Sequence, residues 1–221
     1  MQIIPANEYF SLEERKMLTQ KSTFLAWKSI IIHYAWIVAA FALVYYFPNP
    51  FTVIISLFIL GGMQLGCSVI MHDTGHHAMF PNKKLNDFIG QWLGAYPLFN
   101  NMISYRNYHF VHHINNGTEE DPDILLTRGY PTSQRSMIRK FIRDLTGQTG
   151  IKALSGMIMM HLGYLEYSLG GKVIKVSQTD RTWKEFFKVF FEKMSGPILS
   201  NLLIFSILAI LASPWLYLLW I

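Results

Sequence analysis

Charged residues are absent from three long stretches of this 221-residue chain. Lys, Arg, Asp and Glu are missing from residues 29–47, 51–71 and 197–221. Each stretch is close to the roughly 20 residues that a helix needs to cross the hydrocarbon core of a bilayer. One such stretch could be a buried helix of a soluble protein. Three of them in a short chain predict three membrane spans instead.

Other absences exclude several classes of protein and of catalytic site. The single Cys67 lies within the second uncharged stretch, so a disulfide framework is excluded and a small apolar packing residue is expected. No apolar segment precedes the first span, so the N-terminus does not resemble a cleavable secretion signal. The HExxH motif of zinc proteases, a Ser or Cys nucleophile motif and a Gly-rich phosphate loop are all missing. Gly61-Gly62 lies in mid-span, where close helix packing is the expected reason for it.

Basic residues are missing from residues 29–82 and from everything after Lys193. By the positive-inside rule, this distribution predicts that the N-terminus and residues 72–196 are cytoplasmic. The short link Pro48-Asn49-Pro50 predicts a tight helical hairpin whose turn faces outside. The net charge of +5 then belongs to the cytoplasmic face. There it favours anionic lipid headgroups or an acidic protein partner over nucleic acid.

The remaining segments predict further helices. Ser11-Leu12-Glu13-Glu14 is typical of a capping box that opens a short helix. Residues 86–104 are too interrupted for a span and favour an interfacial or re-entrant segment. Residues 151–169 predict a helix that lies on or dips into the membrane, and residues 181–193 a basic helix leading into the last span. The expected fold class is an all-α membrane protein, with a two-helix hairpin, a C-terminal span and cytoplasmic or interfacial helices in one domain, 1–221.

Six of the eight histidines fall into two clusters after the second span, and the first cluster follows that span directly. The clusters are His72-Asp-Thr-Gly-His76-His77 and His109-Phe-Val-His112-His113. Residues four apart share a helix face, so two adjacent helix ends could present six imidazoles to one or two metal ions. The ring nitrogens that do not bind metal need hydrogen-bond acceptors, for which the candidates are Asp73, Asp121 and Asp123.

Two residues outside the clusters are weaker candidates. His161 is either an additional ligand or a structural residue at the membrane interface. Arg106 either pairs with Asp121 or Asp123 and orients the second cluster, or makes an ordinary surface or headgroup contact.

These motifs resemble the first two histidine boxes of the membrane fatty acid desaturase and hydroxylase superfamily. Arg106-Asn-Tyr before the second cluster, and Asn115, Asn116 and Asp121-Pro122-Asp123 after it, add to the resemblance, which runs from about residue 10 to the end. It implies a non-haem di-iron centre at the cytoplasmic mouth of a four-span bundle. It also implies O2 and electrons from a ferredoxin-, rubredoxin- or cytochrome b5-like donor. On this resemblance the iron ligands would be His72, His76, His77, His109, His112 and His113.

The resemblance also implies a third box, of the HxxHH type, but no histidine follows His161. We therefore expect a C-terminally incomplete domain, or a partner chain that supplies the missing ligands, with the second iron site incompletely held. The expected activity is desaturation of an acyl-lipid or acyl-thioester in a bacterial inner membrane. Two alternatives stay open. One is hydroxylation or ketolation of a lipid, alkane or carotenoid, and the other is a non-catalytic metal-binding subunit or inactive fragment.

Overall fold

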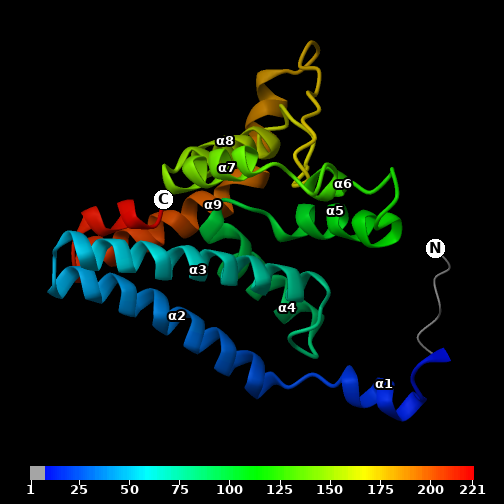
Figure 1. The fold of residues 1–221 in the computed structure, drawn as a ribbon, viewed down its shortest axis with the longest axis horizontal. Helices are drawn as coiled ribbons and strands as arrows, with labels where there is room; N and C mark the ends of the chain where they lie inside the picture. Colours follow the sequence, from blue (N-terminus) through cyan, green and yellow to red (C-terminus); the bar gives the residue numbers. More distant parts are fainter. Residues whose placement is uncertain (1–7) are drawn as a thin grey trace.

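The computed structural model describes residues 8–221 and shows a helical protein (Figure 1). Within these residues, β pairing is limited to one isolated bridge between Leu165 and Lys175. The helices, including a π-helical turn (η2) and two 3-10 segments (η3 and η4), are α1 (Leu12–Leu18), α2 (Thr23–Tyr46), α3 (Pro50–Gly75), α4 (Lys83–Ile89), η2 (Gly90–Ala95), η3 (Tyr96–Leu98), α5 (Met102–Asn115), α6 (Ile124–Thr127), α7 (Gln134–Leu145), α8 (Gln148–His161), α9 (Trp183–Leu211) and η4 (Pro214–Leu219).

Three helices, α2, α3 and α9, are long and apolar enough to cross a membrane. The all-α class with three spans is therefore confirmed. The bounds of the third span differ from the predicted 197–221. Helix α9 already begins at Trp183, takes in the basic segment, and ends at Leu211. Pro214 cannot continue the helical hydrogen bonds, so the chain turns there and η4 folds back onto the spans.

Local sequence signals account for the ends of the first helices. At the start of α1, the Ser11 hydroxyl accepts the Glu14 N–H at 3.2 Å, and the Glu14 carboxylate accepts the Ser11 N–H at 2.8 Å. This is the predicted capping box. At the start of α3, the Asn49 side chain accepts the backbone N–H groups of Phe51 and Thr52. Only residues 47–49 separate α2 from α3, which gives the tight hairpin.

Residues 86–104 pack directly on the end of α3, an arrangement that positions the second histidine cluster. The contact depends on glycine, because a Cβ at Gly94 would lie 2.8 Å from the backbone nitrogen of Met71. A Cβ at Gly90 would likewise come too close to the hydroxyl oxygen of Thr74. The expectation of close packing at Gly61-Gly62 is wrong, since no atom lies within 4 Å of a Cβ built at either position.

The C-terminal residues complete the packing around α3. The indole of Trp220 donates to the Pro97 carbonyl at 3.1 Å, and the hydroxyl of Tyr217 donates to the Asn201 side chain at 3.0 Å. An apolar core holds α2, α3, α9 and η4 together around the buried residues Ala40, Leu60 and Cys67. The bundle thus fixes the end of α3 from which the first histidine cluster projects.

Candidate metal centre

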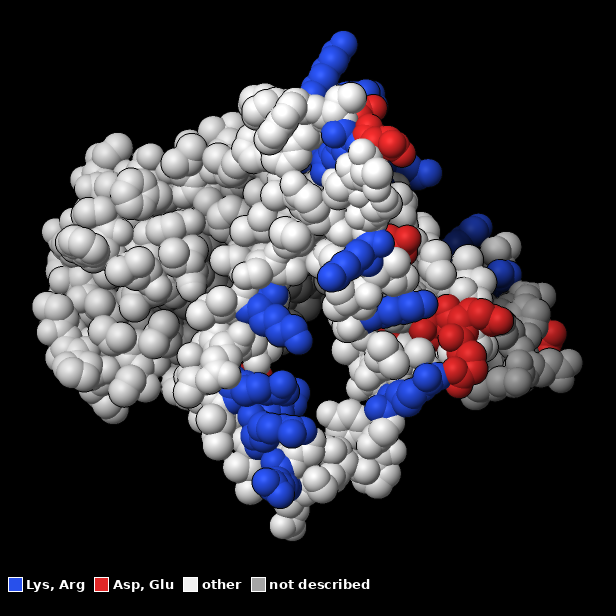
Figure 2. All heavy atoms as spheres, turned by 90° about the horizontal axis from the view of Figure 1, so that it is seen from above, with Lys and Arg blue, Asp and Glu red and all other residues white. Residues whose placement is uncertain are grey.

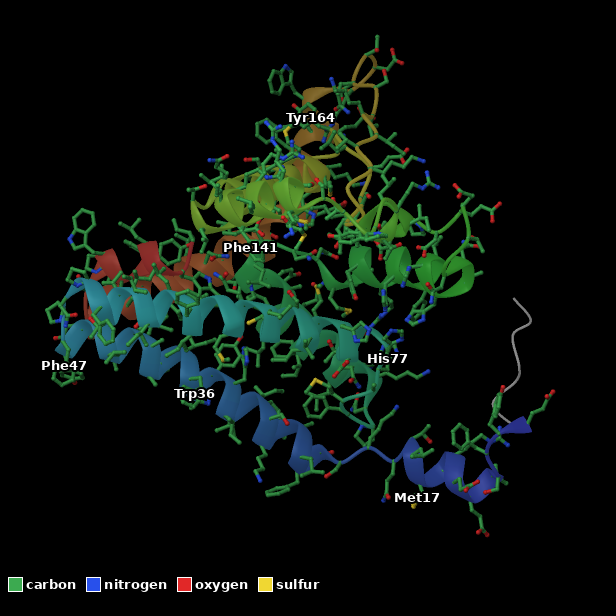
Figure 3. The ribbon with its side chains drawn as sticks, viewed as in Figure 1. Met17, Trp36, Phe47, His77, Phe141 and Tyr164 are labelled. Atoms are coloured by element: carbon green, nitrogen blue, oxygen red, sulfur yellow. The ribbon has the colours of Figure 1, made fainter. Side chains whose placement is uncertain are left out.

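Two helix segments carry the histidines. The last turn of α3 carries His72, and His76 follows directly at its C-cap. Helix α5, which begins after an Asn101 side-chain cap, carries His109 and His113 one turn apart. In Figure 3 the label His77 marks the end of α3, which lies below α5. The two segments pack against each other, so residues about 35 positions apart face one another.

Three ring nitrogens converge on one point between these segments. The Nε2 of His109 lies 3.0 Å from that of His76, the Nε2 of His113 lies 3.2 Å from that of His76, and the His109 and His113 atoms are 2.9 Å apart. A metal bound at about 2.1 Å to each of three mutually perpendicular nitrogens holds them about 3.0 Å apart. The spacing therefore fits three neighbouring ligands of one octahedral transition-metal ion.

A fourth imidazole completes this group. The candidate ligand atoms of His72, His76, His109 and His113 all lie within 4.8 Å of one another. The Nδ1 atom of His72 is 2.8 Å from the Asp73 carboxylate, which leaves Nε2 for the cluster. Such a carboxylate fixes the tautomer and the orientation of a metal-binding ring. Asp73 is therefore placed where the sequence predicts it.

The surroundings of His76 and His109 favour neutral imidazole. Burial lowers the pKa of His109 to about 4, and the charges of the surrounding histidines add to the effect. The pKa of His76 is lowered for the same two reasons, burial first and its neighbours His72 and His113 next. Neutral imidazole keeps the lone pair that binds a metal. At neutral pH these two rings are therefore ready to accept a cation without first losing protons.

His112 faces the acidic loop and does not belong to the group of four. Its Nδ1 atom lies 2.7 Å from Asp121 and 3.7 Å from Asp123. Burial would raise the pKa of Asp121, but hydrogen bonds from His112 and from the backbone of Asp123 and Gly117 outweigh it and lower the pKa to about 2. Asp121 is thus ionised and can hold the Nδ1–H form of His112. The Nε2 atom of this ring remains available for a metal.

His77 is turned away from the group of four. Its backbone is left-handed, with φ of 54°, and its Nε2 atom lies 3.0 Å from Asp87 and 3.1 Å from Arg106. Burial would raise the pKa of Asp87, but the hydrogen bonds from Arg106 and His77 lower it. Of the six ligands predicted from the sequence, the structure brings four together and leaves His77 and His112 on separate carboxylates.

The predicted pairing of Arg106 with Asp121 or Asp123 is wrong. The Arg106 guanidinium instead pairs with Asp87 at 2.5 Å. The reason is geometric, because Arg106 lies on the side of α5 that faces α3 and α4. Asp123 is held elsewhere, by the hydroxyl of Tyr108. Asp87 was missed as a functional candidate, although it is an acid within the otherwise largely apolar segment 86–104.

His161 and Tyr105 complete the surroundings. His161 is buried and its Nε2 atom lies 2.8 Å from the Phe99 carbonyl, so it ties α8 to the loop before α5 and does not join the group of four. Tyr105 stacks on His109, with ring centroids 5.0 Å apart and planes at 14°. Burial raises the pKa of Tyr105 to about 12. Sequence reasoning missed this residue, although its position four before His109 on a helix is a usable signal.

Comparisons with known proteins bear on this arrangement. Residues 48–221 match the model of the fatty acid desaturase family. An omega-6 fatty acid desaturase of Glycine max is 25% identical over 164 residues, which cover 66% of this chain and 40% of the relative. A beta-carotene ketolase of a Paracoccus species is 28% identical over 116 residues, 51% of this chain and 44% of the relative.

A third relative matches a shorter segment. A dihydrorhizobitoxine desaturase of Bradyrhizobium elkanii is 35% identical over 72 residues, 32% of this chain and 20% of the relative. The chain spans less than half the length of each of these curated relatives. No solved structure matches.

Proposed function

Because this chain belongs to the fatty acid desaturase family, we propose that it acts in a membrane as an iron-dependent desaturase of an acyl-lipid or acyl-thioester. The observation that carries the proposal is the convergence of four imidazoles at the end of an apolar span. Imidazole is a suitable ligand for iron, and a site beside membrane helices suits an apolar chain as substrate. Bound iron would supply the activation of O2.

We propose that His72, His76, His109 and His113 hold the first iron. His112 is the next candidate ligand, because its Nδ1 atom contacts Asp121 and its Nε2 atom is free. We assign His112 and His77 to a second iron site that these two residues hold incompletely. Ligands for that site would come from a partner chain or a further segment. Asp73 and Asp121 fix the tautomers of His72 and His112, which keeps the metal-binding nitrogens unprotonated.

The proposed reaction balances with external electrons. A CH2–CH2 unit, O2, two electrons and two protons give a CH=CH unit and two waters. The electrons would come from an acidic ferredoxin-, rubredoxin- or cytochrome b5-like donor. The distribution of Lys and Arg favours a cytoplasmic site for this exchange. The membrane that we propose is a bacterial inner membrane.

A second candidate activity uses the same residues. The match to a beta-carotene ketolase supports an oxygenase that hydroxylates or ketolates a lipid, alkane or carotenoid. In hydroxylation a C–H unit, O2, two electrons and two protons give an alcohol and one water. The two outcomes differ in how the C–H bonds are presented to the metal, so the products distinguish them.

The test has two stages. Iron per chain is first measured in the gently solubilised protein by elemental analysis, with His76→Ala as the variant and His161→Gln as the control. Protein in vesicles then receives O2, a reducing system and deuterium-labelled acyl lipids, and the lipids are examined by mass spectrometry. Loss of two hydrogens supports desaturation, and oxygen incorporation supports the second activity. Iron bound equally by wild type and His76→Ala would overturn the assigned site.

A further inference from the structure

Helix α7 carries an apolar face that the fold leaves uncovered. Apolar residues recur every three or four positions along this helix, and within residues 8–221 no residue of α7 is buried. Ile138 is 59% exposed and Leu145 is 77% exposed. The face consists of Met137, Ile138, Phe141, Ile142 and Leu145.

The opposite face of α7 is basic. It carries Arg135, Arg139, Lys140 and Arg143, all of them exposed. The only acidic residue of the α7–α8 hairpin is Asp144, which pairs with Lys140 at 2.8 Å. Among the described residues, none of the three arginines pairs with a carboxylate. Figure 2, a view onto the side where this hairpin lies, shows Lys and Arg gathered along both sides of a hollow.

The hairpin of α7 and α8 lies alongside the spans. Gly147, in a left-handed conformation with φ of 75°, makes the turn between the two helices, and α8 packs on α9 (Figure 1). The first turns of α8 share a cavity of about 450 Å³ with Gln64 of α3 and Trp220. Gln64 belongs to the uncharged stretch 51–71. Gln64 lies seven residues before Met71, where that stretch ends, which is about 10 Å along the helix. The α7–α8 hairpin therefore lies alongside the cytoplasmic half of α3, within about 10 Å of the end of its apolar stretch.

We propose that α7 lies in the headgroup region of the bilayer and binds anionic phospholipids. Its apolar residues would enter the acyl boundary while its arginines contact lipid phosphates, which is how a basic amphipathic helix engages a membrane surface. A polybasic segment is attracted to an anionic leaflet and hardly at all to a zwitterionic one. An acidic soluble protein would match the charge but not the five-residue apolar face. This inference does not depend on which reaction the metal centre performs.

The experiment places a spin label on the apolar face of the full chain. Ile142→Cys carries the nitroxide, because Cys67 is buried and does not compete for the label. The protein is placed in nanodiscs of phosphatidylcholine alone or with phosphatidylglycerol, and accessibility of the label to O2 and to a water-soluble nickel chelate is measured. The test variant is Arg135→Gln with Arg139→Gln and Arg143→Gln. The matched control is Lys172→Gln with Lys175→Gln and Lys188→Gln, which removes the same charge from exposed sites outside α7.

We expect the label to enter the lipid phase in anionic discs and to do so less in zwitterionic ones. Each basic residue near an anionic surface strengthens association about fivefold, so the triple arginine variant should weaken the anionic preference about a hundredfold. The lysine control should keep it. A label equally deep in both discs, or aqueous in both, would overturn the proposal. A label that leaves water only when an acidic redox protein is added would assign the surface to a protein partner instead.

Discussion

The side chain of Arg106 donates from Nε to the carbonyl of Gly75 at 2.7 Å, across the junction of the two histidine-bearing helices. Gly75 is the last residue of α3, where carbonyls have no partner within the helix. Arg106 belongs to α5 and also contacts Asp87 of α4. One guanidinium therefore caps α3 and joins three elements at the point where His76 and His109 meet.

Replacing Arg106 should loosen this junction. Arg106→Gln removes a charge-assisted pair with Asp87 and leaves the α3 carbonyls without their cap, which we expect to lower stability by about 2 kcal/mol. Arg106→Lys keeps the charge but not the fork of donors, so it should restore only part of the loss. Thermal unfolding and iron content in one detergent measure both effects.

The matched control is Arg128→Gln, because Arg128 pairs with Glu119 on the surface. That change should cost less than about 1 kcal/mol. If Arg106→Gln unfolds at the same temperature as Arg128→Gln and binds as much iron as wild type, the capping role of Arg106 is wrong.

The four converging imidazoles should dominate iron binding. His109→Ala or His76→Ala removes one of the nitrogens that lie 3.0 Å apart, so iron content should fall to a small fraction of the wild-type value. His77→Ala should retain more iron, since its ring is held by Asp87 and Arg106. Elemental analysis of all three variants decides the order. Equal loss in His77→Ala and His76→Ala would show that the bound state recruits His77 into the first site.

Much of this centre could be predicted from spacing, and the rest depends on contacts that spacing does not describe. The i, i+4 pairs of His72 with His76 and of His109 with His113 give the group of four directly. The left-handed backbone at His77, which turns its ring towards Asp87, has no comparable signal, because glycine is the usual residue there. The three spans could be predicted because three long stretches of the sequence contain no charged residue. The predicted third span, 197–221, is too long at its end, because α9 stops at Leu211 and Pro214 prevents the helix from continuing.

Asp121 should fix the tautomer of His112 without binding a metal itself. Asp121→Asn replaces an acceptor held at 2.7 Å from Nδ1 by a group that can donate, so His112 loses its fixed tautomer. If His112 is an iron ligand, affinity for iron should fall about 10- to 100-fold. A competition titration with a chelator measures this. Glu120→Gln is the control, because Glu120 is the exposed neighbour and makes no contact with a histidine among the described residues. An unchanged affinity in Asp121→Asn would remove His112 from the site.

Gly94 should not tolerate a larger residue, because η2 packs against the backbone of α3 at this position. A Cβ at Gly94 would lie 2.8 Å from the nitrogen and 3.0 Å from the Cα of Met71, and backbone atoms inside a helix cannot yield as a flexible side chain does. Gly94→Ala should therefore push η2 away from α3 and lower stability by about 1–3 kcal/mol. Because η2 leads into α5, iron content should fall as well.

Gly61→Ala is the matched control, since a Cβ there meets no atom within 4 Å. It should leave iron content unchanged and raise stability by about 0.5–1 kcal/mol, because alanine loses less conformational freedom than glycine inside a helix. Thermal unfolding of the two variants in the same detergent, followed by elemental analysis, makes the comparison. Equal unfolding temperatures would mean that η2 does not rest on the backbone of Met71, and that the position of α5 is fixed by Arg106 and the histidines alone.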